Sequence, residues 1–262
     1  MSPSPFLRVV RALLLLAFAA YFLVPLLAMF DFSTQVRGSA PGRTWANWEY
    51  MFRDEDFRSA IIASLLLALF TVVLMVTLLV PTMVWVRLRV PRASKVIEFL
   101  CLLPLTIPAL VIVVGISNVY SWVTYVLGDS PLVLTFAYVV LVLPYSYRAI
   151  DAALSAIDVA TLSEAARSLG AGWFTVIVRI VLPNITGGVL GAAFIAVALV
   201  LGEFVFASLL HFDTLPVAMA AIYKSNGPAA MAAALASMLF ASALLLALTF
   251  LSRDRHKQGA SS

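Results

Sequence analysis

Few residues in this sequence place a reactive or charged side chain where it could do chemistry. Glu203 is the clearest, because it is an acid within a long apolar segment, and an ionisable group in a membrane segment is costly enough to be a functional candidate. Its carboxylate could attract a cation that crosses the membrane, or it could join two helices as a polar contact. Asn118 and Tyr120 add polar groups within apolar sequence, and we group them with Glu203 as candidates for lining a pathway.

The sequence contains no motif for catalysis or for a bound cofactor. A glycine-rich phosphate loop ending in Lys-Ser or Lys-Thr is absent, as are His-Glu-x-x-His, Gly-x-Ser-x-Gly and a cysteine–histidine pair. His211 and Asp213 are too few for a metal site, so we interpret them as polar loop residues. We therefore expect no catalytic residue, no cofactor and no metal, and a protein that is not an enzyme.

The composition is that of an integral membrane protein. Of 262 residues, 63% are hydrophobic and 11% are charged, whereas soluble domains average about a quarter charged residues. The net charge of +4 does not indicate nucleic-acid binding, because most cations stand at the ends of apolar runs, where membrane topology accounts for them. We expect an all-α fold in one membrane domain, residues 1–262, in contact with lipid.

Six segments are long and apolar enough to be membrane spans, since a helix needs about 20 apolar residues to cross a bilayer. We place them at approximately 10–31, 59–87, 96–120, 131–148, 184–210 and 228–252. A secretory signal is the alternative for the first, but its apolar run exceeds the roughly 7–15 residues of a signal core. Pro104 and Pro108 interrupt the third, which then either lines a cavity or packs as a kinked helix.

The distribution of basic residues predicts the orientation. With both ends of the chain in the cytoplasm, the inner segments hold twelve of the 17 Lys and Arg residues and the outer segments hold five. Cytoplasmic loops carry the excess of Lys and Arg in membrane proteins. The N- and C-termini and the polar segment 149–183 are therefore expected to face the cytoplasm.

The polar segment 149–183 begins with the pattern of a short helix. Asp158 can cap it, because its carboxylate can accept from the first free amides. A narrow apolar stripe follows at i, i+3, i+4 and i+7, made of Leu162, Ala165, Ala166 and Leu169. Ser163 and Glu164 are expected to face elsewhere, and Gly170 supplies the left-handed residue that ends the helix. On periodicity alone, this is either a contact surface for a partner or an ordinary amphipathic surface helix.

A second helix is expected over 173–182, with Arg179 in its last turn, where a cation is favoured by the helix dipole. Pro183 then stops this helix and redirects the chain into the fifth span. Within that span, Gly187 and Gly191 have the spacing that lets membrane helices pack closely.

The polar segment resembles the signature loop of bacterial ABC importer permeases. The matching residues, all at the family's spacing, are Glu164-Ala165-Ala166, Gly170, Ile180 and Leu182-Pro183. The preceding segments Leu143-Pro144-Tyr145 and Arg148-Ala149 are also similar to that family. The resemblance extends from the first expected span to the sixth.

This resemblance implies a type I importer fold and a set of partners. Two permease subunits, identical or different, would pack together in a bacterial inner membrane, with two cytoplasmic ABC ATPase subunits that bind ATP beneath them and a substrate-binding protein outside. It also implies that the polar segment couples the spans to the ATPase. The coupling residues would be Leu162, Glu164, Ala165, Ala166, Leu169, Gly170, Ile180, Leu182 and Pro183.

The closest likeness is to the spermidine/putrescine branch, so the resemblance suggests a polyamine as substrate. Relatives serving thiamine, iron, phosphonates, sulfate and molybdate share the pattern and are the alternatives. For Glu203, the Gly202-Glu203-Phe204 sequence also resembles relatives that carry anions, which favours a structural contact.

A secondary transporter would show more charge in the spans and two matching halves. A membrane enzyme would need clustered acids or histidines at one membrane face.

Overall fold

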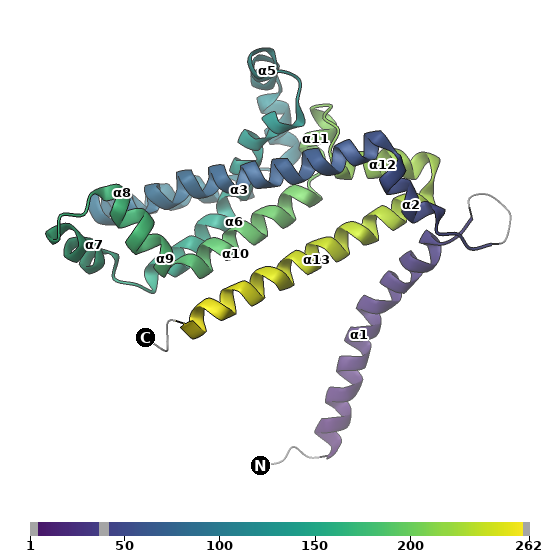
Figure 1. Ribbon diagram of the computed structural model, residues 1–262, viewed down its shortest axis with the longest axis horizontal. Helices are drawn as coiled ribbons and strands as arrows, with labels where there is room; N and C mark the ends of the chain where they lie inside the picture. The colour runs from purple at the N-terminus through teal and green to yellow at the C-terminus, as the bar shows by residue number, and fades with distance from the viewer. Residues whose placement is uncertain (1–4, 37–41, 259–262) are drawn as a thin grey trace. The chain divides into compact units, whose positions relative to one another are not determined.

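The computed structural model describes the backbone of residues 5–36 and 42–258, and the side chains of residues 6, 9–36 and 42–243. Within this part the chain is helical apart from short connections (Figure 1). The β pairing found there is an isolated bridge between Gln35 and Arg43. The expected all-α fold is confirmed.

The chain divides into two compact units, and we describe each by itself. The first comprises residues 1–58 and 218–242, and the second comprises residues 59–217 and 243–262. The expectation of a single membrane domain over 1–262 stays a prediction.

The first unit contains α1 (Pro5–Ser33), α2 (Ala46–Arg53) and parts of α12 (Leu215–Ser225) and α13 (Gly227–Gln258). A polar junction holds α2 to the end of α1. The Asn47 amide donates to the Ser33 carbonyl at 2.8 Å and to the Gln35 carbonyl at 2.9 Å, and the Trp48 indole donates to the Ser33 hydroxyl at 3.2 Å. The polar segment after α1 therefore contains a short helix that is attached to the end of α1.

The second unit contains the remaining helices and the polar segment. In chain order they are α3 (Glu55–Arg89), η1 (Pro91–Ala93), α4 (Ser94–Leu102), η2 (Leu103–Thr106), α5 (Ala109–Leu127), η3 (Pro131–Leu134), α6 (Thr135–Ser155), α7 (Val159–Ser168), α8 (Trp173–Thr175), η4 (Val176–Val181), α9 (Leu182–Asn184), α10 (Thr186–Gly202) and α11 (Val205–Leu209). The first four residues of α3 belong to the first unit.

Four described helices are long and apolar enough to cross a membrane, at Val9–Ser33, Glu55–Arg89, Ala109–Leu127 and Pro131–Ser155. A fifth arises if Trp173–Asn184 and Thr186–Gly202, which are bent by 81° at Ile185, count as one span. The predicted sixth span, 228–252, falls in α13. The described apolar part of that helix, Gly227–Ala243, is shorter than a full span, and the side chains beyond it lie outside the described residues.

The third predicted span, 96–120, is two helices in the structure, α4 and α5, with α5 beginning at Ala109. Pro108 lacks an amide hydrogen, and a residue before proline is driven to extended backbone. Ile107 accordingly has φ −110° and ψ 124°. The spanning helix therefore starts after the second proline and runs to Leu127, seven residues beyond the predicted end.

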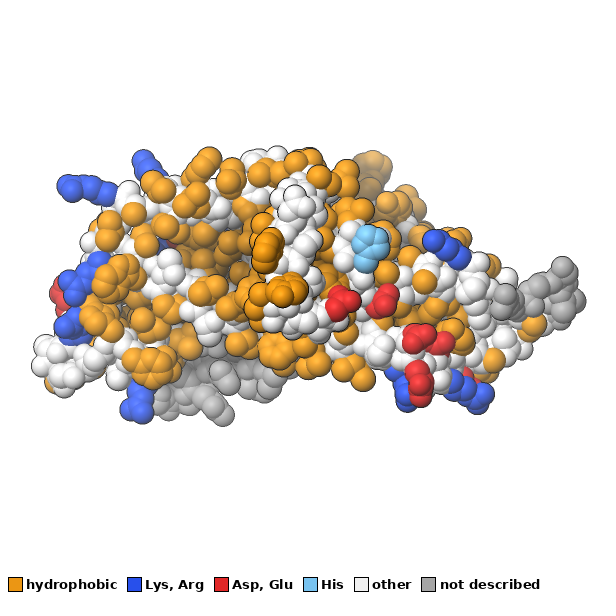
Figure 2. Space-filling model, turned by 90° about the horizontal axis from the view of Figure 1, so that it is seen from above, with side chains coloured by type: hydrophobic (Ala, Val, Ile, Leu, Met, Phe, Trp, Pro, Cys, Tyr) orange, Lys and Arg blue, Asp and Glu red, His pale blue; other side chains and the backbone are white. Residues whose placement is uncertain are grey.

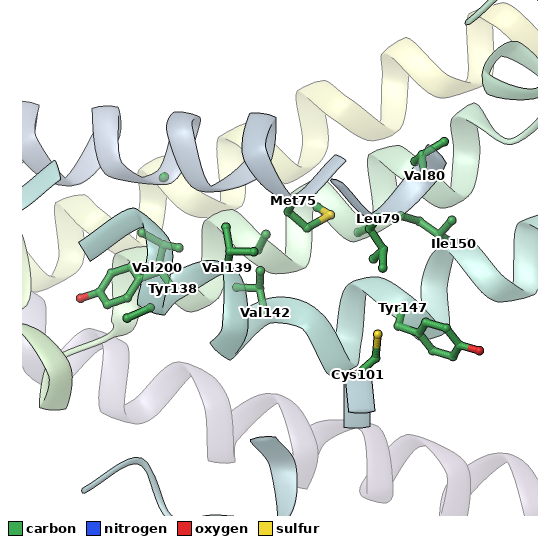
Figure 3. Close-up of a cluster of buried hydrophobic side chains, with 14 of the residues drawn as sticks. Met75, Leu79, Val80, Cys101, Tyr138, Val139, Val142, Tyr147, Ile150 and Val200 are labelled. Atoms are coloured by element: carbon green, nitrogen blue, oxygen red, sulfur yellow. The ribbon is translucent and has the colours of Figure 1, made fainter. Parts of the chain in front are cut away.

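The centre of the second unit is a close pairing of α6 with α10, covered by α3. Buried side chains of α6 and α3 point toward one another in this core (Figure 3), among them Val142 and Ile150 of α6 and Met75 of α3. Outside it, many apolar side chains of α3 and α5 are exposed, and Figure 2 shows hydrophobic side chains over much of the visible surface. Such surfaces suit a lipid environment, where packing contacts hold helices together.

Small residues set the distance between α6 and α10. A Cβ atom added at Gly188 would lie 2.4 Å from the Ala153 Cβ and 2.8 Å from the Ala149 carbonyl oxygen. Gly187 and Gly191, the pair singled out from the sequence, have nothing within 4 Å of an added Cβ. The predicted close packing of helices is therefore present, but at Gly188 and not at Gly187 or Gly191. The reason is that Gly188 lies on the face of α10 that contacts α6.

Candidate functional site: the loop between α6 and α10

The first helix of the loop, α7, starts at the predicted cap. Asp158 accepts hydrogen bonds from the Thr161 amide at 3.1 Å and from the Thr161 hydroxyl at 2.7 Å. The hydroxyl hydrogen bond first, and then the amide hydrogen bond, lower the pKa of the Asp158 carboxyl. Asp158 thus satisfies an amide that the helix start would leave without a partner, which confirms the cap.

The end of α7 also follows the prediction. Gly170 has φ 86°, its amide donates to the Arg167 carbonyl at 2.9 Å, and the Ala171 amide donates to the Ala166 carbonyl at 3.1 Å. These two bonds form a Schellman motif, which requires a left-handed residue that only glycine adopts without strain. The turn after α7 therefore has a fixed direction.

The buried face of α7 is rotated from the predicted apolar stripe. Val159 and Ser163 are buried, and Ala166 packs against the core. Ser163, expected to face elsewhere, is 2% exposed, whereas Leu169 is 89% exposed. Leu169 leaves the stripe because the helix ends at Ser168. Of the predicted coupling residues, Glu164 and Ala165 are also exposed on α7, so part of the apolar stripe is free to meet a partner.

The second helix of the loop is present but is not a regular α-helix. Residues 173–184 are helical, and Val176–Val181 within them form a wider π-helix, a variant often found at functional sites. Ile180 and Leu182 are half-buried, and Pro183 is exposed. The chain bends one residue beyond Asn184, close to the stop predicted at Pro183.

Charged side chains join the C-terminal part of α6, where the loop begins, to α3 and α4. Arg87 at the end of α3 donates to the Asp151 carboxylate at 2.7 Å, to the Asp151 carbonyl at 3.0 Å and to the Ser155 hydroxyl at 2.7 Å. Arg148 of α6 pairs with Glu98 of α4 at 3.0 Å. Beside these pairs is an open polar cavity of about 480 Å³, lined in part by Arg87, Asp151 and Asp158.

An aromatic and cationic cluster joins the loop to α3. The Trp173 ring lies 4.5 Å from the Arg167 guanidinium carbon and 5.1 Å from that of Arg89. The Trp85 ring is 6.3 Å from Trp173 in an edge-on arrangement, and Arg89 also lies 5.9 Å from Trp85. These contacts were not predicted from the sequence. The sequence does show basic and aromatic residues both near the end of α3 and around Trp173. A single sequence, however, does not indicate which of these residues are in contact.

Glu203 lies at the break between α10 and α11. Its carboxylate accepts from the Tyr138 hydroxyl at 3.0 Å, from the Val205 amide at 2.8 Å and from the Phe206 amide at 3.0 Å. It therefore caps α11 and links that helix to α6. Of the two interpretations of Glu203, this geometry supports the polar contact between helices.

The other two candidate pathway residues do not share a face of α5. Asn118 is exposed, whereas Tyr120 is buried. The Tyr120 hydroxyl donates to the Val133 carbonyl at 3.1 Å and accepts from the Ala137 amide at 3.1 Å. Tyr120 thus fixes the start of α6, and the one hydrogen of its hydroxyl is already donated within the protein.

Comparisons with known proteins agree with this architecture. The family model described as "Binding-protein-dependent transport system inner membrane component" matches residues 79–258. A chain from the "Crystal structure of a bacterial ABC transporter involved in the import of the acidic polysaccharide alginate" has the same fold, with a TM-score of 0.66 and 16% identity over 96% of this chain and 99% of that chain. A search of curated sequences finds no significant match. Because the family model covers well over half of the sequence, from the middle of α3 to the end of α13, this chain belongs to the family of binding-protein-dependent transport system inner membrane components.

Proposed function

We propose that this chain is an ABC importer permease in which α7 docks onto a cytoplasmic ATPase subunit. The observation that carries the proposal is the exposed end of α7. A capped helix with a fixed turn presents Leu169, Ala165 and Glu164 outward, while Val159 and Ser163 hold it to the core. The exposed Leu169 and Ala165 side chains leave apolar atoms of α7 available for contact with a docking partner.

In the proposed mechanism, the loop transmits the movement of the ATPase subunits to the spans. ATPase closure pushes α7, and the Schellman turn at Gly170 passes the displacement to the helix over 173–184. That helix leads directly into α10, which packs on α6. Energy comes from ATP bound by the ATPase subunits, because this sequence has no phosphate-binding loop.

The orientation and the partners are part of the same proposal. The excess of basic residues favours cytoplasmic N- and C-termini and a cytoplasmic segment 149–183. The family's description as a binding-protein-dependent inner membrane component supports a bacterial inner membrane, an external substrate-binding protein and a second permease subunit, which the polyamine-type resemblance suggests is a different chain.

Crosslinking tests the docking. In the assembled complex, a cysteine at the exposed Ala165 should crosslink to the ATPase subunit. The matched control is Ser163→Cys, two residues away and buried, which should not crosslink. An assembled complex in which Ala165→Cys never reaches the ATPase would contradict the proposal.

For the substrate, we propose a polyamine such as spermidine or putrescine, on the resemblance alone. Thiamine, iron, phosphonate and sulfate stay as alternatives. Because the Glu203 carboxylate already accepts hydrogen bonds from Tyr138, Val205 and Phe206, we expect selectivity to come mainly from the binding protein. The solute that co-purifies with the binding protein of the same complex would identify the substrate class. Thiamine or an oxyanion bound to that protein would contradict the proposal of a polyamine.

Two measurements separate the proposal from other classes of protein. A secondary transporter would keep importing its solute when the ATPase subunit is deleted, whereas we expect uptake to stop. A membrane enzyme would show activity as an isolated chain, whereas we expect no ATP hydrolysis by this chain alone. Persistent uptake or hydrolysis under these conditions would overturn the assignment.

A further inference from the structure

Three elements distant in sequence meet at Trp173. It is the first residue of α8, Arg167 is in the last turn of α7, and Arg89 is the last residue of α3. Both guanidinium groups lie within 6 Å of the indole ring, at 4.5 Å and 5.1 Å from its centroid. That separation is the range in which a cation is attracted to the face of an aromatic ring. One indole therefore connects α7 to α3.

Ala171 attaches the turn between α7 and α8 to the core, but the residues beside it have little packing. A Cβ atom added at Gly170 or at Gly172 would have no neighbour within 4 Å, and Leu169 and Phe174 are 89% and 80% exposed. Arg167 is attached to this turn twice, because its carbonyl accepts from Gly170 while its side chain stacks on Trp173. The side-chain cluster thus supplies a lateral contact where the backbone turn is open.

We propose that Trp173 is a positioning residue that transmits the displacement of α7 to α3. Through Arg167 it receives the motion of α7, and through Arg89 and Trp85 it passes that motion to the end of a 35-residue helix. Arg87, two residues before Arg89, is bonded to Asp151 of α6, so α3 and α6 respond together. This inference rests on the proposed docking of α7 and adds a second route beside the one through α10.

The alternative for this cluster is interfacial anchoring, since tryptophan and arginine are common at membrane boundaries. The two roles differ in what their loss affects. An anchor contributes to insertion and to the amount of complex, whereas a positioning residue determines how much solute is transported for each ATP hydrolysed. The ratio of transport to hydrolysis is therefore the readout that anchoring alone does not change.

The test uses the complete transporter in vesicles. In Trp173→Leu, the solute transported per ATP should fall about fivefold, the loss expected from two exposed cation–π contacts, while ATP hydrolysis continues. Trp173→Phe, which keeps an aromatic face, should recover most of the ratio. Arg89→Gln changes an exposed side chain without altering the loop and should lower the ratio to an intermediate value.

The matched control is Trp122→Leu, the same substitution at a 72% exposed tryptophan of α5, which should leave the ratio unchanged. Crosslinking from Ala165→Cys is measured in each variant and should persist. Should crosslinking be absent even with Trp173 intact, the docking proposal itself is rejected. A normal ratio in Trp173→Leu or in Arg89→Gln, with crosslinking intact, would overturn only the role of Trp173.

Discussion

Glycine has different roles at the contact between α6 and α10 and in the loop that joins these two helices. Where α10 crosses α6, Gly188 leaves no room, since an added Cβ would lie 2.4 Å from Ala153. In the loop, an added Cβ at Gly170 meets open space, and the glycine is needed for its φ of 86°. The first glycine permits a contact and the second permits a conformation. Substitutions at the two sites should therefore separate loss of assembly from loss of transmission.

The largest effect is expected at Gly188. Gly188→Val would push a branched side chain into the Ala149 carbonyl, and overpacking of this kind costs about 1–3 kcal/mol or more. We expect a lower melting temperature and less extractable complex. Gly187→Val, one residue away and facing open space, is the control. Equal losses in both variants would mean that the α6–α10 contact does not limit stability.

A smaller loss of stability but a large loss of function is expected at Gly170. A side chain at φ 86° costs about 1–2 kcal/mol, which should redirect the turn while the subunit still inserts. In Gly170→Leu, ATP hydrolysis should continue and uptake should fall. Gly172→Leu has equal space at φ −75° and should transport normally. Wild-type uptake by Gly170→Leu would contradict the coupling role of the turn.

Loss of the ion pair between Arg87 at the end of α3 and Asp151 of α6 should have an intermediate effect. Both side chains are partly buried, at 24% and 34% exposure, and the pair is 2.7 Å apart. A double-mutant cycle of Arg87→Gln and Asp151→Asn, measured on the free energy of unfolding, should give a coupling energy on the order of 1 kcal/mol. This value is near the top of the range measured for exposed ion pairs. The exposed pair Arg58 and Glu55, 3.8 Å apart, should give almost none. Similar values for both pairs would show that burial adds nothing at this junction.

The features predicted from sequence were those set by local chemistry. The Asp158 cap and the left-handed Gly170 each depend on residues within a few positions of one another, and both are present. The apolar runs likewise predicted most of the spanning helices, because the need to satisfy backbone groups in lipid leaves helices as the main solution.

The missed features depend on contacts between distant segments. Which glycine of α10 faces α6 depends on the rotation of two helices, and the sequence pattern favoured Gly187 and Gly191 over Gly188. The stacking of Arg89 on Trp173 joins residues more than 80 positions apart. The hydrogen bond from the Tyr138 hydroxyl to the Glu203 carboxylate joins residues 65 positions apart, so the local sequence could not predict that Glu203 links α11 to α6.

The smallest effect is expected at the α7 cap and depends on pH. The pKa of Asp158 is lowered by its hydrogen bonds from Thr161, so the charged cap stabilises α7 at and above the ordinary carboxyl pKa and loses this contribution as pH falls through the lowered value. Hydrogen exchange of the Thr161 amide should therefore be faster in Asp158→Ala than in the wild type at neutral pH, and the difference should shrink below about pH 4. Asp158→Asn keeps an acceptor at every pH and should protect this amide without that dependence. If Asp158→Asn showed the same acid-induced loss as the wild type, another group would be titrating, and the start of the docking helix would depend on contacts with the body and not on its own cap.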